Sequence, residues 1–173
     1  MTADATLQRM KILIVDDEPA NVALLQEILI ENGYARIETV RHSKLALDVC
    51  KTFEPDLILL DLMMPPPDGF AILESLRAER EGMFLPVVVL TADTNEETKR
   101  RALEAGATDF LCKPFDHTEV MLRIRNLLET RRLHILLDNQ RAALEETFRE
   151  QMAELRARIV ELQKRNEPVP QQA

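Results

Sequence analysis

The sequence has few of the residues and segments that mark several large classes of protein. Its two cysteines, Cys50 and Cys112, lack metal-ligand spacing and make a poor disulfide framework, so both are expected to be buried or half-buried thiols. No apolar run approaches the roughly 20 residues that span a membrane. No stretch of five basic residues offsets the net charge of −8. Neither nucleic acid nor membrane is therefore predicted as a partner, and partners are expected to be proteins.

The length of 173 residues is enough for one domain with a sizeable core and an additional segment outside it. The first ten residues carry two charges and no apolar core, which is unlike a signal peptide. A cytoplasmic location is therefore predicted.

Short apolar runs alternate with segments of helical period, which is typical of βα units around a parallel sheet. Five strands are predicted, at 12–15, 36–40, 57–60, 87–90 and 108–112. Five helices are predicted, at 19–32, 43–52, 68–79, 95–105 and 116–130. Three of the strands are continuously apolar, as expected where helices cover both faces of a sheet. The fold class predicted is α/β.

Two local signals refine these helices. Ser43 and Asp68 are predicted to cap the helices that they open. The segment 95–105 is mostly charged and should be the least firmly anchored helix, because it has only three residues to bury, Ala102, Leu103 and Ala105.

Polar side chains follow four of the predicted strands, at the point where each strand ends. Asp16 and Asp17 follow the first strand, Asp61 the third, Thr91 the fourth and Lys113 the fifth. The carboxyl ends of parallel strands meet at one rim of the sheet, where α/β proteins place their chemistry. Three carboxylates there repel, and Mg²⁺ is the hard cation that best suits a small site of this kind. Thr91 offers a hydroxyl, and Lys113 a positive charge, to the oxygens of a phosphoryl group. Together these strand-end residues predict a phosphoryl-transfer site in which Asp61 is the acceptor.

The chain resembles the receiver domain of bacterial response regulators over residues 10–130. The motifs that carry the resemblance are 15–19 (VDDEP), 60–65 (LDLMMP), 68–69 (DG), 90–92 (LTA) and 110–115 (FLCKPF), together with the spacing between them. The resemblance implies a flavodoxin-like, doubly wound, five-stranded parallel sheet in the order 2-1-3-4-5, with five helices.

The resemblance also implies the chemistry of the rim. Asp61 would take a phosphoryl group from a phosphohistidine on a sensor histidine kinase or a phosphotransfer protein. Thr91 and Lys113 would hold the transferred phosphate oxygens. The chain would be a phosphoacceptor that assists its own phosphotransfer and dephosphorylation, and not an enzyme. The peptide between Lys113 and Pro114 is expected to be cis.

The magnesium ligands follow from the same resemblance. Asp17, Asp61 and the backbone carbonyl of Met63 would ligate Mg²⁺, and Asp16 would help through water. The Met63 side chain lies where it would hinder the hydrolytic water, and Asp93 lines the same entrance. A moderately long-lived phosphoryl group is therefore predicted.

Phe110 occupies the position of the family's switch residue. When Thr91 moves toward the phosphoryl oxygens it vacates space beside the strand, and the ring of Phe110 can rotate inward at little cost because it has no hydroxyl. The weakly anchored helix at 95–105 would shift with it. Ordinary core packing of Phe110 is the alternative. The run Pro65-Pro66-Pro67 is expected to stiffen the loop after Asp61.

Residues 131–165 contain no glycine and carry apolar residues at a heptad-like spacing with one phase slip near Leu144 to Phe148. The apolar positions are Leu133, Leu137, Leu144, Phe148, Met152, Leu155, Ile159 and Leu162. One continuous helix from 116 to 165 is predicted, paired with a second copy as a coiled coil. Residues 166–173 are predicted to be a disordered tail.

Other functions remain open at this stage. The chain would alternatively be a receiver and linker from a larger regulator whose output domain, a cyclic-dinucleotide enzyme or a kinase, is absent. A phosphatase of the haloacid dehalogenase type needs an acid where Met63 stands. A scaffolding pseudo-receiver disagrees with the intact set of site residues.

Overall fold

The computed structural model describes residues 3–79, 84–92 and 95–165. Its centre is a five-stranded sheet in the order β2-β1-β3-β4-β5, with every neighbouring pair parallel. The strands are β1 (Ile12–Val15), β2 (Ile37–Val40), β3 (Leu57–Asp61), β4 (Val87–Thr91) and β5 (Asp109–Cys112). The predicted flavodoxin-like order is confirmed.

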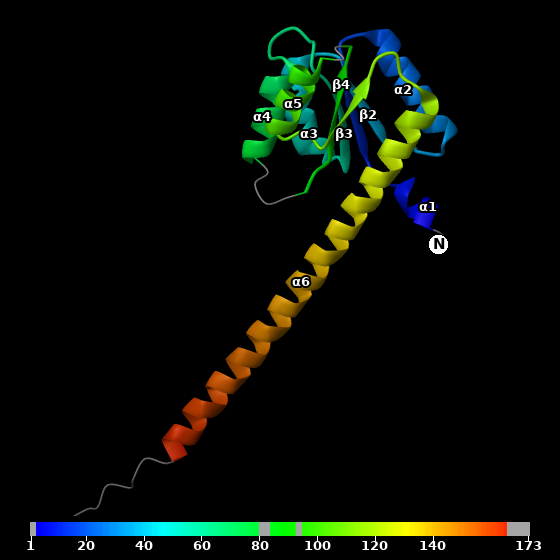
Figure 1. The fold of residues 1–173 in the computed structure, drawn as a ribbon. Coiled ribbons are helices and arrows are strands. Elements are labelled where there is room, and N and C mark those ends of the chain that lie inside the picture. The colour runs from blue at the N-terminus through cyan, green and yellow to red at the C-terminus, as the bar shows by residue number, and fades with distance from the viewer. Residues whose placement is uncertain (1–2, 80–83, 93–94, 166–173) are drawn as a thin grey trace, which may run out of the picture. The chain divides into compact units, whose positions relative to one another are not determined.

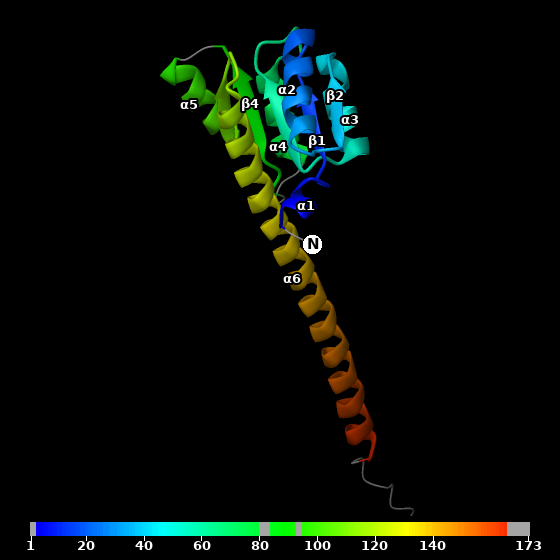
Figure 2. The same ribbon diagram turned by 90° about the vertical axis from the view of Figure 1, so that its right-hand side faces the viewer.

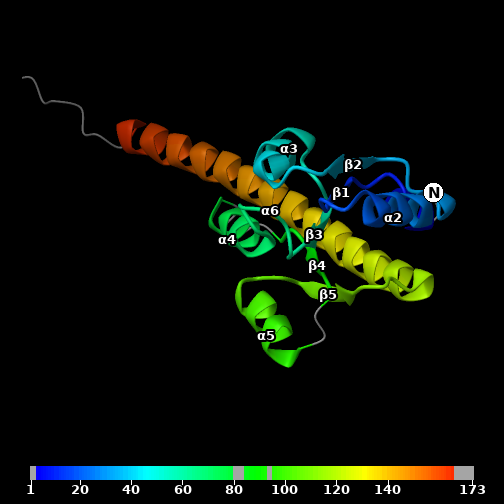
Figure 3. The ribbon, with the colours of Figure 1, turned by 90° about the horizontal axis from the view of Figure 1, so that it is seen from above.

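Helices cover both faces of this sheet (Figures 1 and 3). On one face lie α3 (Ala46–Phe53), α4 (Gly69–Glu79) and α5 (Glu96–Glu104), with the 3₁₀ helix η1 (Ser43–Leu45) leading into α3. On the other lie α2 (Pro19–Glu31) and the first turns of α6 (His117–Arg165). Strands β1, β3 and β4 are consequently buried at every residue.

One short helix was not predicted. Helix α1 (Ala3–Leu7) precedes β1 and lies near its amino end (Figure 2). Leu7 and Met10 are buried, so the core begins earlier than residue 10, where the resemblance begins. Five residues are too few to show a helical period, which is why the sequence pattern missed them.

The two predicted helix caps have different outcomes. Asp68 caps α4, because its Oδ1 accepts a hydrogen bond of 2.9 Å from the backbone N–H of Ala71. The prediction for Ser43 was wrong, since its hydroxyl instead donates to the carbonyl oxygen of Pro65 at 2.8 Å. Ser43 therefore ties the β2–η1 connection to the proline-rich loop that follows Asp61.

Helix α5 buries even less than predicted, because Leu103, one of the three residues expected to be buried, is 46% exposed. Ala102 is its only buried residue, and two cation–π contacts supplement that burial. The Arg101 guanidinium lies 4.1 Å from the centroid of the Phe70 ring, and the Lys99 ammonium lies 4.9 Å from that of Phe110.

The chain divides into two compact units, Met1–Leu133 and His134–Ala173, and α6 continues through both as one helix to Arg165. This continuity was predicted, whereas the predicted disorder of 166–173 falls outside the described residues. Within the described ranges, no helix combines the length and the apolar character needed to cross a membrane.

Gly69 allows the chain to pass close to the end of β3. A Cβ at this position would collide with the carbonyl oxygen of Asp61 and lie 2.6 Å from the Cα of Leu62. Because backbone atoms cannot yield as a side chain can, Gly69→Ala is expected to cost about 3 kcal/mol of unfolding free energy. Urea denaturation measures this cost. Ala71→Gly two residues later is the control, expected to cost about 1 kcal/mol, and equal costs would contradict the collision.

Candidate functional site

Three carboxylates meet at the carboxyl rim of the sheet. Asp16 and Asp17 follow β1, and Asp61 is the last residue of β3. One oxygen from each lies within 4.8 Å of the others. Asp16 is 0% exposed and Asp61 is 3% exposed, so their charges have little water to screen them. The strand-end aspartates therefore come together as the sequence predicted.

Lys113 partly neutralises this cluster. Its ammonium lies 2.9 Å from Asp16 Oδ2 and 3.1 Å from Asp61 Oδ1, so one cation bridges two carboxylates. The backbone N–H of Lys113 donates to the carbonyl oxygen of Thr91 at 2.8 Å, which ties the loop after β5 to the end of β4. The peptide between Lys113 and Pro114 is cis, as expected. Thr91 itself is buried at the same rim.

The shared cation does not remove the cost of burying these charges. Burial raises the pKa of Asp61 above its usual value, the charge of Asp16 adds to this, and Lys113 acts in the opposite direction. For Lys113, burial lowers the pKa, but hydrogen bonds to Asp16 and Asp61 and their charges together raise it. Asp61 is thus a carboxylate that gains from any further cation at the rim.

Asp16 is held by contacts that the sequence did not reveal. The amide of Asn21 donates to both of its carboxylate oxygens, at 3.2 and 3.1 Å, and the backbone N–H of Glu18 donates to Oδ1 at 2.9 Å. An asparagine in the first turn of the helix after the aspartate pair was the available signal. Asn21 orients Asp16 toward the cluster and is a positioning residue.

Oxygen atoms make up this donor set, which is the chemistry that Mg²⁺ requires. Two or three carboxylates with room for water or phosphate oxygens match its preference for few protein ligands. The residues present thus fit a Mg²⁺ site.

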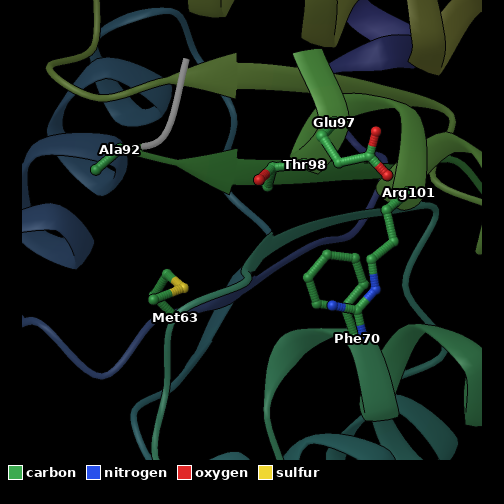
Figure 4. A pocket seen from close by; sticks show the side chains of 6 residues that line it. All are labelled: Met63, Phe70, Ala92, Glu97, Thr98 and Arg101. Carbon is green, nitrogen blue, oxygen red and sulfur yellow. The ribbon is translucent and has the colours of Figure 1, made fainter. Parts of the chain in front are cut away.

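A cavity of about 490 Å³ opens beside the loop that follows Asp61 (Figure 4). Its lining comprises Met63, Phe70, Ala92, Glu97, Thr98 and Arg101. The Met63 side chain is 74% exposed, while its backbone N–H donates to Asp61 Oδ1 at 3.3 Å. Figure 4 shows the Arg101 guanidinium lying across the Phe70 ring on the far side of the cavity. Asp93, which was predicted to line this entrance, lies outside the described residues.

Phe110 lies in β5, is half-buried and has two cations close to its ring. Besides Lys99, the Arg123 guanidinium lies 5.6 Å from the ring centroid. Arg123 is held there by both carboxylate oxygens of Asp109, each at 2.7 Å. The ring is therefore not part of the fully buried core, and neither flanking cation was predicted.

The model of the response regulator receiver domain family matches residues 12–125. The chain belongs to this family. It is 42% identical over 118 residues to the alkaline phosphatase synthesis transcriptional regulatory protein PhoP of Bacillus subtilis, covering 68% of this chain and 48% of that protein. It is 33% identical over 139 residues to a probable cyclic di-GMP phosphodiesterase of Vibrio cholerae, covering 80% and 31%.

The fold is also similar to solved receivers. A putative response regulator from Chloroflexus aurantiacus superposes with a TM-score of 0.66 at 30% identity, covering 70% of this chain and 98% of that one. The chain spans about half or less of the length of the curated relatives named above. The names of these relatives, a transcriptional regulatory protein and a probable cyclic di-GMP phosphodiesterase, therefore describe proteins longer than this chain.

If the folded carboxylate cluster holds Mg²⁺, the ion should raise the melting temperature. A hundredfold excess over the dissociation constant contributes about 2.7 kcal/mol. Since the folded pKa of Asp61 is raised, the metal-free protein binds this proton more tightly than the unfolded chain does, and its stability falls as pH rises through that pKa. The rise in melting temperature caused by Mg²⁺ should therefore grow from about pH 4 to about pH 7. Scanning calorimetry measures this rise, and an equally large rise in Asp17→Asn would contradict the site.

Proposed function

We propose that this chain is a phosphorylation-switched response regulator in which Asp61 accepts a phosphoryl group from a phosphohistidine. The donor is a sensor histidine kinase or a phosphotransfer protein, and the proposed location of this chain is the cytoplasm. The observation that carries the proposal is the bridge from Lys113 to Asp16 and Asp61 within a cluster of three carboxylates. The Lys113 ammonium beside an Asp61 oxygen supports the proposal, because it would also lie close to a phosphoryl group attached to that carboxylate.

In the transfer, an Asp61 carboxylate oxygen attacks phosphorus, the phosphorus–nitrogen bond breaks, and the imidazole leaves with the bonding pair. Lys113 moves its hydrogen bonds from the carboxylates to a phosphoryl oxygen, and the Thr91 hydroxyl donates to another. Asp17, Asp61 and the Met63 carbonyl would hold Mg²⁺, with Asp16 acting through water. When bound, the ion neutralises charge on the phosphoryl oxygens. The chain is thus a phosphoacceptor and not an enzyme acting on other molecules.

Exposed Met63 at the cavity mouth would shield the acyl phosphate from water, and Asp93 would tune the same entrance.

Incubation with acetyl phosphate and Mg²⁺ should add one phosphoryl group, measured by intact mass, and removal of Mg²⁺ should prevent it. After removal of the donor, the group should outlast several minutes. Absence of any Mg²⁺-dependent adduct would refute the proposal, and decay within seconds would refute the role of Met63.

The output would pass from Phe110 and α5 to α6, and through residues 131–165 to a second copy of the chain. Neither nucleic acid nor membrane is proposed as a partner. The longer relatives favour one alternative, in which residues 10–130 and 131–165 are the receiver and linker of a regulator with a separate output domain.

Phe110→Ala is expected to uncouple phosphorylation from this output. The ring could no longer fill the space that Thr91 vacates, and Lys99 and Arg123 would lose their ring contacts. Beryllofluoride, which mimics the phosphoryl group, should change the association constant of the parent chain in sedimentation and leave that of Phe110→Ala unchanged. Phe53→Ala is the control, because it removes a ring that contacts Lys11 and not Lys99 or Arg123. This variant should keep the change in association constant on addition of beryllofluoride. A full response in Phe110→Ala would show that the ring is only core packing.

A further inference from the structure

The second compact unit exposes an apolar stripe along one helix. Leu137, Leu144, Phe148, Leu155 and Ile159 are between 54% and 71% exposed. Apolar residues in a stripe of this length ordinarily face another surface. Residues 134–165 carry six basic and six acidic side chains, so two copies of this segment have no net charge to repel each other.

The stripe repeats every 11 residues. Segments 133–143, 144–154 and 155–165 each begin with leucine and carry a second apolar residue four positions later. These residues form the pairs Leu133 with Leu137, Leu144 with Phe148, and Leu155 with Ile159. The eighth positions, Gln140, Gln151 and Leu162, complete a seam with steps of four, three and four. The phase slip in the heptad interpretation is therefore part of a regular pattern.

An 11-residue repeat completes three turns at about 3.67 residues per turn, whereas a heptad repeat has 3.5. A heptad seam supercoils to the left, and an 11-residue seam supercoils to the right. We propose that two copies of this chain pair through this seam as a parallel, in-register, right-handed coiled coil. The inference rests on the proposed dimer and adds its direction, register and hand.

Gln140 and Gln151 select the parallel arrangement. In register, each glutamine faces its own copy, and a primary amide can donate to and accept from an identical amide. The antiparallel alignment that would best match the leucines places Gln140 against Met152, which leaves the Gln140 amide without a polar partner. It also brings the charged Arg141 into the seam against Gln151. Arg141 instead pairs with Glu145 of its own helix at 2.9 Å.

Single cysteines in the full chain test the seam. The background carries Cys112→Ala, while Cys50 is 2% exposed and stays. Gln140→Cys and Gln151→Cys should each cross-link to themselves on mild oxidation, since facing Cβ atoms in a seam approach disulfide distance. Thr147→Cys, seven residues after Gln140, and Glu146→Cys on the opposite face should cross-link about fivefold less.

Each outcome has one meaning. Cross-linking of Thr147→Cys equal to that of Gln140→Cys would establish a heptad and overturn the 11-residue repeat. Cross-linking only in a mixture of Arg141→Cys with Gln151→Cys would establish antiparallel pairing and overturn the inference while leaving the dimer. Sedimentation of the uncross-linked parent with and without beryllofluoride separates these cases, because a monomer under both conditions would refute the proposed dimer itself.

Discussion

Replacing Asp61 with asparagine is expected to abolish phosphorylation by acetyl phosphate and by a phosphohistidine donor. The amide lacks the anionic oxygen that attacks phosphorus, and it also withdraws one of the three oxygen ligands proposed for Mg²⁺. Uptake of phosphate should fall by at least about 10³-fold. Intact mass and radiolabelled phosphate measure this loss. The metal-free variant should melt at a higher temperature than the parent, because burial and Asp16 disfavour the Asp61 charge in the folded chain.

Asp68→Asn is the matched control. Asp68 lies in the same loop, and its side chain caps α4, a role that asparagine fills equally well. This variant should take up phosphate at the parental rate. Full phosphorylation of Asp61→Asn, or its loss in Asp68→Asn as well, would contradict the assignment of the acceptor.

Lys113→Met is expected to have the second largest effect. The substitution removes the donor to the phosphoryl oxygen, and loss of one donor of this kind typically slows a reaction by about 10²–10³-fold. It also leaves Asp16 and Asp61 facing each other without their shared cation. Removing one partner from a buried ion pair costs about 3 kcal/mol or more of unfolding free energy.

Two comparisons separate these effects. Mg²⁺ should restore more stability to Lys113→Met than to the parent, because the ion supplies the charge that lysine gave, while the phosphotransfer rate stays low. Lys51→Met removes an exposed ion pair with Glu79 and should change stability by less than about 1 kcal/mol. Parental phosphotransfer in Lys113→Met would contradict the proposed role.

The sheet was predictable because its signal is local. Each strand was found within one residue of its end, and Asp61 and Thr91 extend β3 and β4 by one residue beyond the apolar runs. Strand order came from the resemblance rather than from the runs. Helix α1 was missed because it is too short for a period, and the cap at Ser43 was wrong because a distant carbonyl, Pro65, competes for its hydroxyl.

The residues at the rim of the site were predictable from local sequence, whereas the side chains that support them were not. The residues of the rim each follow a strand, so topology alone brings them together. Asn21, Lys99 and Arg123 were missed because their roles depend on which helix face meets which strand, and that is a tertiary property. The repeat at 133–165 lay in the sequence throughout, but its heptad interpretation accepted a phase slip.

Locating the phosphoryl group tests the central claim most directly. The chain is phosphorylated with acetyl phosphate and Mg²⁺, the acyl phosphate is reduced with borohydride, and the digest is sequenced by tandem mass spectrometry. Borohydride converts a phosphorylated aspartate to homoserine and leaves other aspartates unchanged. The account predicts homoserine at position 61 and nowhere else. Homoserine at Asp16 or Asp17, or none at position 61, would contradict it.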